Sequence, residues 1–220
     1  MNSVLIVANL KSFKNENEAK TWIEEFTKHI ETLDNLEGKE IVICPSFTLL
    51  PLFSSSLSNT KIKLGAQNVS PYDEGAYTGE VNAKQIKDFG SYVIIGHSER
   101  RNYFGETDEI VGKKYKLAEK YDLTPILCVQ DKETQVPEGV KIIAYEPVFA
   151  IGSGNADTPK NASEVAKTFL EKNTNYTIVY GGSVTSDNVS SFTKGENIRG
   201  VLVGGASLDP LEFIKIIENA

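Results

Sequence analysis

Three side chains of this 220-residue chain could together move a proton, and each of them adjoins a run of apolar residues. Lys11 follows the run VLIVAN, His97 ends the run YVIIGH, and Glu146 follows the run KIIAY. Carboxylates and imidazoles are common general acids and bases near neutral pH. A lysine can offset the negative charge that proton abstraction generates. These residue types predict acid–base chemistry, provided that the fold brings them together.

Each residue also has a simpler interpretation when it is taken alone. His97 could be a core histidine with satisfied hydrogen bonds, Glu146 a surface carboxylate at a strand end, and Lys11 a solvated lysine. The functional interpretation therefore depends on the elements that position the three residues.

Eight apolar runs recur along the chain and predict buried β-strands. The runs span residues 4–9, 40–45, 62–67, 92–97, 124–129, 141–147, 176–182 and 198–205. They are apolar nearly throughout, which is typical of parallel strands covered on both faces. Helical spacing of apolar residues appears between several runs, first at Trp22, Ile23, Phe26, Ile30 and Leu33. The alternation predicts an α/β fold, a single closed (β/α)8 barrel over residues 1–220, with an open doubly wound sheet as the alternative.

The carboxyl ends of the strands in such a barrel form one mouth, where chemistry takes place. The sequence puts Asn9, Lys11, His97, Glu99 and Glu146 at or just after these ends. The last two runs are followed by the glycine pairs of GGSV and GGASL, each of which opens a helix. One glycine pair is more often a tight turn, but two on neighbouring strands can present bare N–H groups to an oxyanion. The mouth is therefore predicted to bind a phosphate.

The segment that follows Glu146 has a rigid start, an apolar middle and a glycine-rich end. An apolar loop left in water costs about 25 cal/mol for each Å² of uncovered surface. We therefore interpret this segment as a lid that excludes water from a bound ligand, with the N–H of Gly152 facing the ligand's anionic end. The predicted lid comprises Pro147, Val148, Phe149, Ala150, Ile151, Gly152, Ser153 and Gly154.

Composition narrows the class of protein further. The formal net charge is −7 and the lysines are scattered, which argues against a nucleic-acid partner. No run approaches the ~20 apolar residues that a membrane span needs, so we expect no membrane partner and a cytoplasmic location. Cys44 and Cys128 end apolar runs and have no paired cysteine motif, which predicts buried thiols and no metal site.

Two connections are unusual in length. Residues 129–140 separate the fifth and sixth runs, and this interval has room for only a turn or two of helix. In contrast, the polar stretch 68–82 is longer than most loops inside compact domains, and such loops are usually functional or disordered.

Together these residues resemble the triosephosphate isomerase family over nearly the whole chain and in the same order. The segments that carry the resemblance are NLK (9–11), AQN (66–68), GAYTGEV (75–81), GHSERR (96–101), YFGETDE (103–109), AYEPVFAIGSG (144–154), YGGSV (180–184) and GVLVGGASL (200–208). The resemblance implies a TIM barrel without metal or cofactor. It also implies an isomerase of glycolysis and gluconeogenesis, which interconverts dihydroxyacetone phosphate and D-glyceraldehyde 3-phosphate through an enediolate.

The resemblance also implies a role for each matched residue. Glu146 would be the base, His97 would polarise the carbonyl, and Lys11 would offset negative charge. Asn9 would contact the substrate, and Glu99 would anchor the lysine region. The resemblance further implies a neutral imidazole at a helix N-terminus, and SERR after His97 can form such a helical turn. The implied phosphate-binding residues are Gly152, Ser183, Gly204 and Gly205, and the implied latches of the closed lid are Tyr180 and Ser183.

The long stretch 68–82 is similar to the family's interdigitating loop, which implies a homodimer. Thr78 would enter a pocket beside the neighbouring subunit's active site, where Arg100 would meet it. The shortened fifth connection departs from the usual family pattern, and a tetramer is therefore also considered. Phe149 stands where tryptophan is commoner in the lid, which could alter lid kinetics without touching the chemistry.

Two other functions remain as alternatives. A non-catalytic barrel that senses a phosphorylated metabolite would be favoured if a charged site residue were missing, and none is missing here. A barrel enzyme of another reaction, such as an indole- or phosphoribosyl-type isomerase, would share the phosphate turns. That alternative leaves EPVFAIGSG and GAYTG unexplained.

Overall fold

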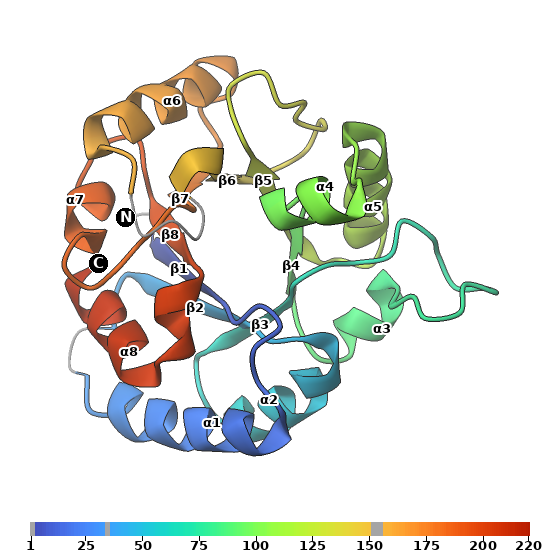
Figure 1. Ribbon diagram of the computed structural model, residues 1–220, viewed down its shortest axis with the longest axis vertical. Helices are drawn as coiled ribbons and strands as arrows, with labels where there is room; N and C mark the ends of the chain where they lie inside the picture. Colours follow the sequence, from blue (N-terminus) through green and yellow to red (C-terminus); the bar gives the residue numbers. More distant parts are fainter. Residues whose placement is uncertain (1–2, 34–35, 151–155) are drawn as a thin grey trace.

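The computed structural model describes residues 3–33, 36–150 and 156–220, and eight parallel strands in it close into a barrel (Figure 1). Each strand pairs with the next along the chain, and the eighth pairs with the first. The strands are β1 Val4–Asn9, β2 Lys39–Cys44, β3 Lys63–Ala66, β4 Tyr92–Ile95, β5 Thr124–Val129, β6 Ile142–Tyr145, β7 Thr177–Tyr180 and β8 Gly200–Val203. The predicted barrel is thus confirmed and the open sheet is excluded, and each predicted run contains its strand to within one residue.

Helices surround the barrel and cover the outer face of its strands (Figure 1). They are α1 Glu16–Ile30, α2 Leu50–Leu57, α3 Ala83–Lys87, α4 Ser98–Phe104, α5 Asp108–Lys120, α6 Pro159–Lys172, α7 Val189–Thr193 and α8 Pro210–Asn219. Among the described residues, no helix has both the length and the apolar character needed to cross a membrane.

Helix α1 illustrates how local sequence sets an element. The Asn15 side chain accepts a hydrogen bond from the Glu18 N–H, and the Glu18 carboxylate accepts one from the Asn15 N–H. This reciprocal capping box satisfies two donors at the helix N-terminus. The buried face of α1 consists of Ala19, Trp22, Ile23, Phe26 and Ile30, which includes four of the five residues expected from their spacing.

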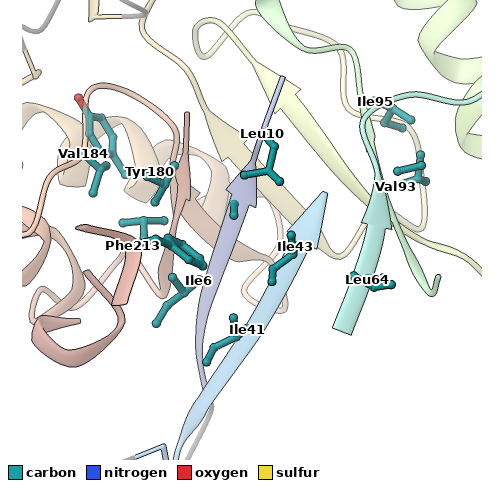
Figure 2. Close-up of a cluster of buried hydrophobic side chains, with 14 of the residues drawn as sticks. Ile6, Leu10, Ile41, Ile43, Leu64, Val93, Ile95, Tyr180, Val184 and Phe213 are labelled. Carbon is teal, nitrogen blue, oxygen red and sulfur yellow. The ribbon is translucent and has the colours of Figure 1, made fainter. Parts of the chain in front are cut away.

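The hydrophobic core has two layers, because successive side chains of a strand point to opposite faces. Leu5 and Val7 of β1 belong to a cluster inside the barrel, whereas Ile6 and Ala8 belong to the larger cluster between strands and helices. Figure 2 shows part of the outer cluster, including Ile6. Burial on both faces explains why the strands appear as continuous apolar runs.

The connection between β5 and β6 contains no helix, although all of its residues are described. It runs as a loop between the two strands (Figure 1). The Asp131 carboxylate accepts hydrogen bonds from the N–H groups of Glu133 and Thr134, at 2.9 and 3.0 Å, which folds the start of the loop into a compact turn. The prediction that this interval is too short for a full helix is therefore confirmed.

The segment between β3 and α3 projects away from the barrel (Figure 1). Tyr72 and Tyr77 stack on each other within it, with ring centroids 4.4 Å apart. Near its base, the Asp73 carboxylate accepts hydrogen bonds from the Tyr121 hydroxyl and the Lys120 ammonium of the α5 region. The long polar stretch is therefore an ordered arm that is tied to the barrel.

The aromatic contacts of α8 lead to a test of the outer core. Phe213 is fully buried and lies against Trp22 and Phe26 of α1, whereas Leu211 on the same helix is 42% exposed. Because a buried cavity would be left, Phe213→Ala should lower the free energy of unfolding by about 3–5 kcal/mol. The matched change Leu211→Ala should cost less than about 1 kcal/mol. Chemical denaturation measures both, and equal losses would contradict this core assignment.

Candidate active site

The carboxyl ends of the strands surround a cavity of about 340 Å³. Its lining comes from the ends of five strands: Asn9 at the end of β1, His97 after β4, Glu146 after β6, and the glycine turns after β7 and β8. Lys11 also lines this cavity. The structure therefore brings together residues from the two ends of the chain, from Asn9 to Leu208.

Glu146 and His97 are in direct contact at the bottom of this mouth. The Nε2 atom of His97 lies 3.0 Å from Oε1 of Glu146, and the two residues are only 7% and 1% exposed, respectively. A buried carboxylate is costly unless hydrogen bonds replace its lost water. Here the backbone N–H of Ser98 donates a hydrogen bond to Oε2 of Glu146 at 2.9 Å.

The hydrogen bonds of His97 assign the proton on its ring. His97 is the N-cap of α4, and its Nδ1 atom accepts a hydrogen bond from the Glu99 N–H at 3.2 Å. An imidazole nitrogen that accepts a hydrogen bond carries no proton, so the ring is assigned as the neutral tautomer protonated on Nε2. The Nε2 atom lies beside the Glu146 carboxylate, and its N–H is the donor that the site can offer to a ligand.

Gly181 makes room for the Glu146 side chain. A Cβ atom on Gly181 would lie 2.8 Å from Cγ of Glu146 and 3.3 Å from the carbonyl oxygen of Tyr145. The first distance is shorter than real contacts of this kind, so a side chain there would displace the carboxylate. The first glycine of GGSV is therefore required by the packing of Glu146 and not only by a turn.

Lys11 has a strained backbone that its neighbours stabilise. Its φ angle is 50°, a left-handed value that is uncommon for residues other than glycine. The Asn9 side chain accepts a hydrogen bond from the Lys11 N–H, and the Gln67 side chain donates one to the Lys11 carbonyl at 2.9 Å. The ammonium group pairs with the Glu99 carboxylate. Backbone strain of this kind is often found at functional sites.

The turn after β8 forms one wall of the cavity. Gly204 and Gly205 both line it, and Gly205 begins a short 3-10 turn that ends at Leu208. A Cβ atom built on Gly205 meets nothing within 4 Å, so a ligand can approach this backbone closely. Ser183, from the turn after β7, lines the same cavity. The two glycine turns predicted to bind an oxyanion, after β7 and after β8, therefore line the same cavity.

Only the first half of the predicted lid lies within the described part of the chain. Pro147 precedes a short 3-10 turn, Val148–Ala150, in which Val148 and Phe149 are more than half exposed and Ala150 is buried. The Ser183 hydroxyl donates a hydrogen bond to the Ala150 carbonyl at 2.6 Å. The Tyr180 hydroxyl accepts one from the Asp157 N–H at 2.7 Å. The remaining predicted lid residues, Ile151, Gly152, Ser153 and Gly154, fall outside the described residues.

A second cavity of about 270 Å³ adjoins the first and shares Asn9, Lys11 and His97 with it. Arg100 and Glu99 lie in its lining, and the Arg100 side chain pairs with Glu106. Thr78 lines neither cavity; it is exposed on the projecting arm. The structure therefore places the two predicted dimer residues on different parts of the chain.

Two hydrogen-bond donors of the site were not assigned a role from the sequence. The Gln67 side-chain amide donates hydrogen bonds to the Lys11 carbonyl at 2.9 Å and to the Cys44 carbonyl at 2.8 Å. A polar residue at the end of the third apolar run was the available signal for it. The Ser98 N–H gave no signal, because a backbone group does not depend on residue type.

The cysteines are buried and free, as predicted. Burial raises the pKa of the Cys128 thiol, and the nearby Glu146 carboxylate raises it further. No group of acidic, histidine and cysteine residues among the described residues is arranged to hold a metal ion.

The fold and this mouth place the chain among the (β/α)8-barrel enzymes, and comparisons with known proteins identify the family. A sequence profile described as triosephosphate isomerase matches residues 4–142 and 136–220, with its two segments meeting at the shortened connection. The chain belongs to the triosephosphate isomerase family.

Individual relatives agree over their full lengths. The chain is 42% identical to the triosephosphate isomerase of Trichodesmium erythraeum over 240 aligned positions, which cover 99% of both chains. It is 43% identical to that of Dictyoglomus thermophilum over 252 positions, covering 100% of both. These alignments are longer than the 220-residue chain, so this member is shortened. The crystal structure of triosephosphate isomerase from Bartonella henselae superposes with a TM-score of 0.85 at 29% identity, covering 98% of both chains.

Burial of the thiols leads to a test of the site's interior. Because the thiolate is the reactive form and burial raises the pKa of both Cys44 and Cys128, the native protein at pH 8 should react with a thiol reagent at least about 100-fold more slowly than the unfolded protein. A colorimetric disulfide reagent with and without guanidinium measures both rates. Rapid reaction of either thiol in the native state would contradict the burial of that cysteine.

Proposed function

We propose that this chain catalyses the interconversion of dihydroxyacetone phosphate and D-glyceraldehyde 3-phosphate, as an enzyme of glycolysis and gluconeogenesis. In this proposal residues 1–220 act as one catalytic domain without metal or cofactor. The observation that carries it is the buried Glu146 carboxylate, 3.0 Å from the His97 Nε2 atom in a cavity walled by glycine turns. A base, a neutral donor and an anion-binding turn are what proton transfer next to a carbonyl requires.

The contact between Glu146 and His97 suggests how the steps proceed. The substrate carbonyl oxygen replaces Oε1 of Glu146 as the acceptor of the His97 Nε2–H. The freed carboxylate removes a proton from the carbon beside the carbonyl, and the electron pair moves onto the oxygen to give an enediolate. His97 moves a proton between the two oxygens, and Glu146 returns its proton to the neighbouring carbon. Substrate and product therefore have the same atoms and the same oxidation level.

Charge and backbone groups would hold the substrate in place. Lys11, whose ammonium group faces Glu99, offsets the charge of the phosphate and of the enediolate. Asn9 lies beside it and fixes the Lys11 backbone. The N–H groups near Gly204 and Gly205, together with Ser183 and Gly152, bind the phosphate. Such local groups are needed because the net charge of −7 repels an anionic substrate.

The exposed apolar side chains after Pro147 support a lid role for this segment. Val148 and Phe149 are 53% and 62% exposed, which costs free energy that closure over a ligand would recover. In the proposal the hydrogen bonds of Ser183 to Ala150 and of Tyr180 to Asp157 hold the two sides of the lid, which excludes water from the enediolate.

A homodimer completes the proposal, with a cytoplasmic location. The projecting arm carries Thr78 together with the exposed Tyr72 and Tyr77. The second cavity, which contains Arg100, would receive the arm of a partner copy beside Lys11. A tetramer would require a further interface, for which the shortened connection between β5 and β6 is the candidate.

The assay that tests the proposed reaction follows D-glyceraldehyde 3-phosphate. Replacing the base by Glu146→Gln should lower kcat by about 10²–10⁴-fold, because the base acts in the transition state. Binding of inorganic phosphate, measured by calorimetry, should change little. The matched change Glu133→Gln, on an exposed residue of the loop between β5 and β6, should leave turnover unchanged.

Two outcomes of that assay would contradict the proposal. Unchanged turnover in Glu146→Gln would exclude this residue as the base. A folded wild type that binds phosphate without turnover would favour the metabolite-sensing alternative.

Light scattering tests the proposed assembly. The wild type should have twice the 24.2 kDa mass of one chain. The change Thr78→Arg should give single chains, because a bulky cation cannot enter a pocket that already holds Arg100. Thr21→Arg, on the exposed face of α1, is the control and should remain a dimer. A single-chain wild type, or a Thr78→Arg protein that stays dimeric, would contradict the assignment.

A further inference from the structure

Asp157 is a buried acidic residue whose carboxylate has no part in the mechanism above. It is only 8% exposed and lies just before Thr158, the N-cap of α6. Its carboxylate accepts hydrogen bonds from the Asn161 side chain at 2.6 Å and from the Thr158 N–H at 2.7 Å. These contacts fix Asp157 to the first turn of α6.

The same residue reaches two neighbouring strands of the barrel. Its backbone N–H donates to the Tyr180 hydroxyl at 2.7 Å, and its carboxylate lies 3.4 Å from the Tyr145 hydroxyl. Tyr145 and Tyr180 are directly paired at the ends of β6 and β7. Asp157 therefore joins the start of α6 to both strand ends.

The ends of β6 and β7 adjoin Glu146, the proposed base. Tyr145 immediately precedes Glu146, and Tyr180 immediately precedes Gly181, whose backbone packs against the Glu146 side chain. Tyr180 is also held from the other side by Phe192, which stacks on it with ring centroids 4.0 Å apart. A shift of either tyrosine would move a neighbour of Glu146.

We propose that Asp157 is a positioning residue for the proposed isomerase reaction: it anchors Tyr145 and Tyr180 to α6 and thereby holds Glu146 in place beside His97. It acts through these tyrosines and does not touch the substrate. The inference rests on the proposed function for its kinetic consequence only, because the position of His97 and Glu146 can be observed without turnover.

The protonation of the two tyrosines is consistent with this arrangement. Burial raises the pKa of each to about 12, and the Asp157 carboxylate adds to this rise, whereas the Asp157 N–H that donates to Tyr180 opposes it there. Both hydroxyls therefore remain protonated across the working range of pH. The Tyr145 O–H can donate to the Asp157 carboxylate throughout that range.

Kinetics of three variants test the proposal. Asp157→Ala should lower kcat at least about tenfold with KM changed less than about twofold, because misplacement of a base slows the chemical step. Tyr145→Phe should lower kcat in the same direction by less, since it removes the longest of the contacts. Asp157→Asn keeps a polar group that can hydrogen-bond to the Tyr145 hydroxyl and should recover most of the turnover. Thr107→Ala, which removes the N-cap of α5, is the control for helix stability alone and should retain kcat.

A spectroscopic measurement follows the site without turnover. The chain has two histidines, so a protein labelled with ¹⁵N-histidine gives separate signals for His97 and His29. Asp157→Ala should shift the His97 ring signals, because the Glu146 contact changes, and should leave those of His29 in place. The same shift, smaller, is expected in Tyr145→Phe.

The outcomes separate the two claims. Folded Asp157→Ala and Tyr145→Phe proteins with wild-type kcat would overturn the positioning role. If Asp157→Ala does not fold, the result with Tyr145→Phe decides. A wild type without turnover would overturn the proposed reaction. In that case the NMR measurement tests the positioning role, and unchanged His97 signals in Asp157→Ala and Tyr145→Phe would overturn it.

Discussion

The contact between the Glu146 carboxylate and the His97 imidazole is the interaction on which the site depends. Glu146 is almost fully buried, and its carboxylate accepts a hydrogen bond from the Ser98 N–H and lies 3.0 Å from Nε2 of His97. The two residues come from β6 and β4, which are separated by β5. The register of these three neighbouring strands brings the ends of β4 and β6 close together, and the interior layer that contains Cys128 packs beneath them.

The strained loop after β1 shows a second way in which the fold supports the chemistry. Lys11 adopts a left-handed backbone conformation at a free-energy cost. Asn9 and Gln67 hold its backbone, and Glu99 holds its ammonium group. Since Glu99 also donates its N–H to His97, one turn at the start of α4 positions both the imidazole and the lysine. The charged groups of the mouth are therefore fixed before any ligand binds.

Much of this arrangement could be predicted from the sequence. Continuous apolar runs identified all eight strands because parallel strands are buried on both faces, and the capped, periodic helix α1 was equally clear. Short helices such as α3 and α7, of five residues each, have too few turns to show a period. The roles of Gln67, Gly181 and Asp157 could not be predicted, because they depend on distances between strands that only the closed barrel sets.

Solvent isotope labelling tests most directly whether the Glu146 and His97 pair transfers a proton through an enediolate. Dihydroxyacetone phosphate would be converted in D₂O and the product analysed by NMR. Because the carboxylate that accepts a proton from carbon exchanges it with solvent, deuterium should appear at carbon 2 of D-glyceraldehyde 3-phosphate. Product formed without any deuterium at that carbon would indicate hydride transfer and would contradict a carboxylate base at this site.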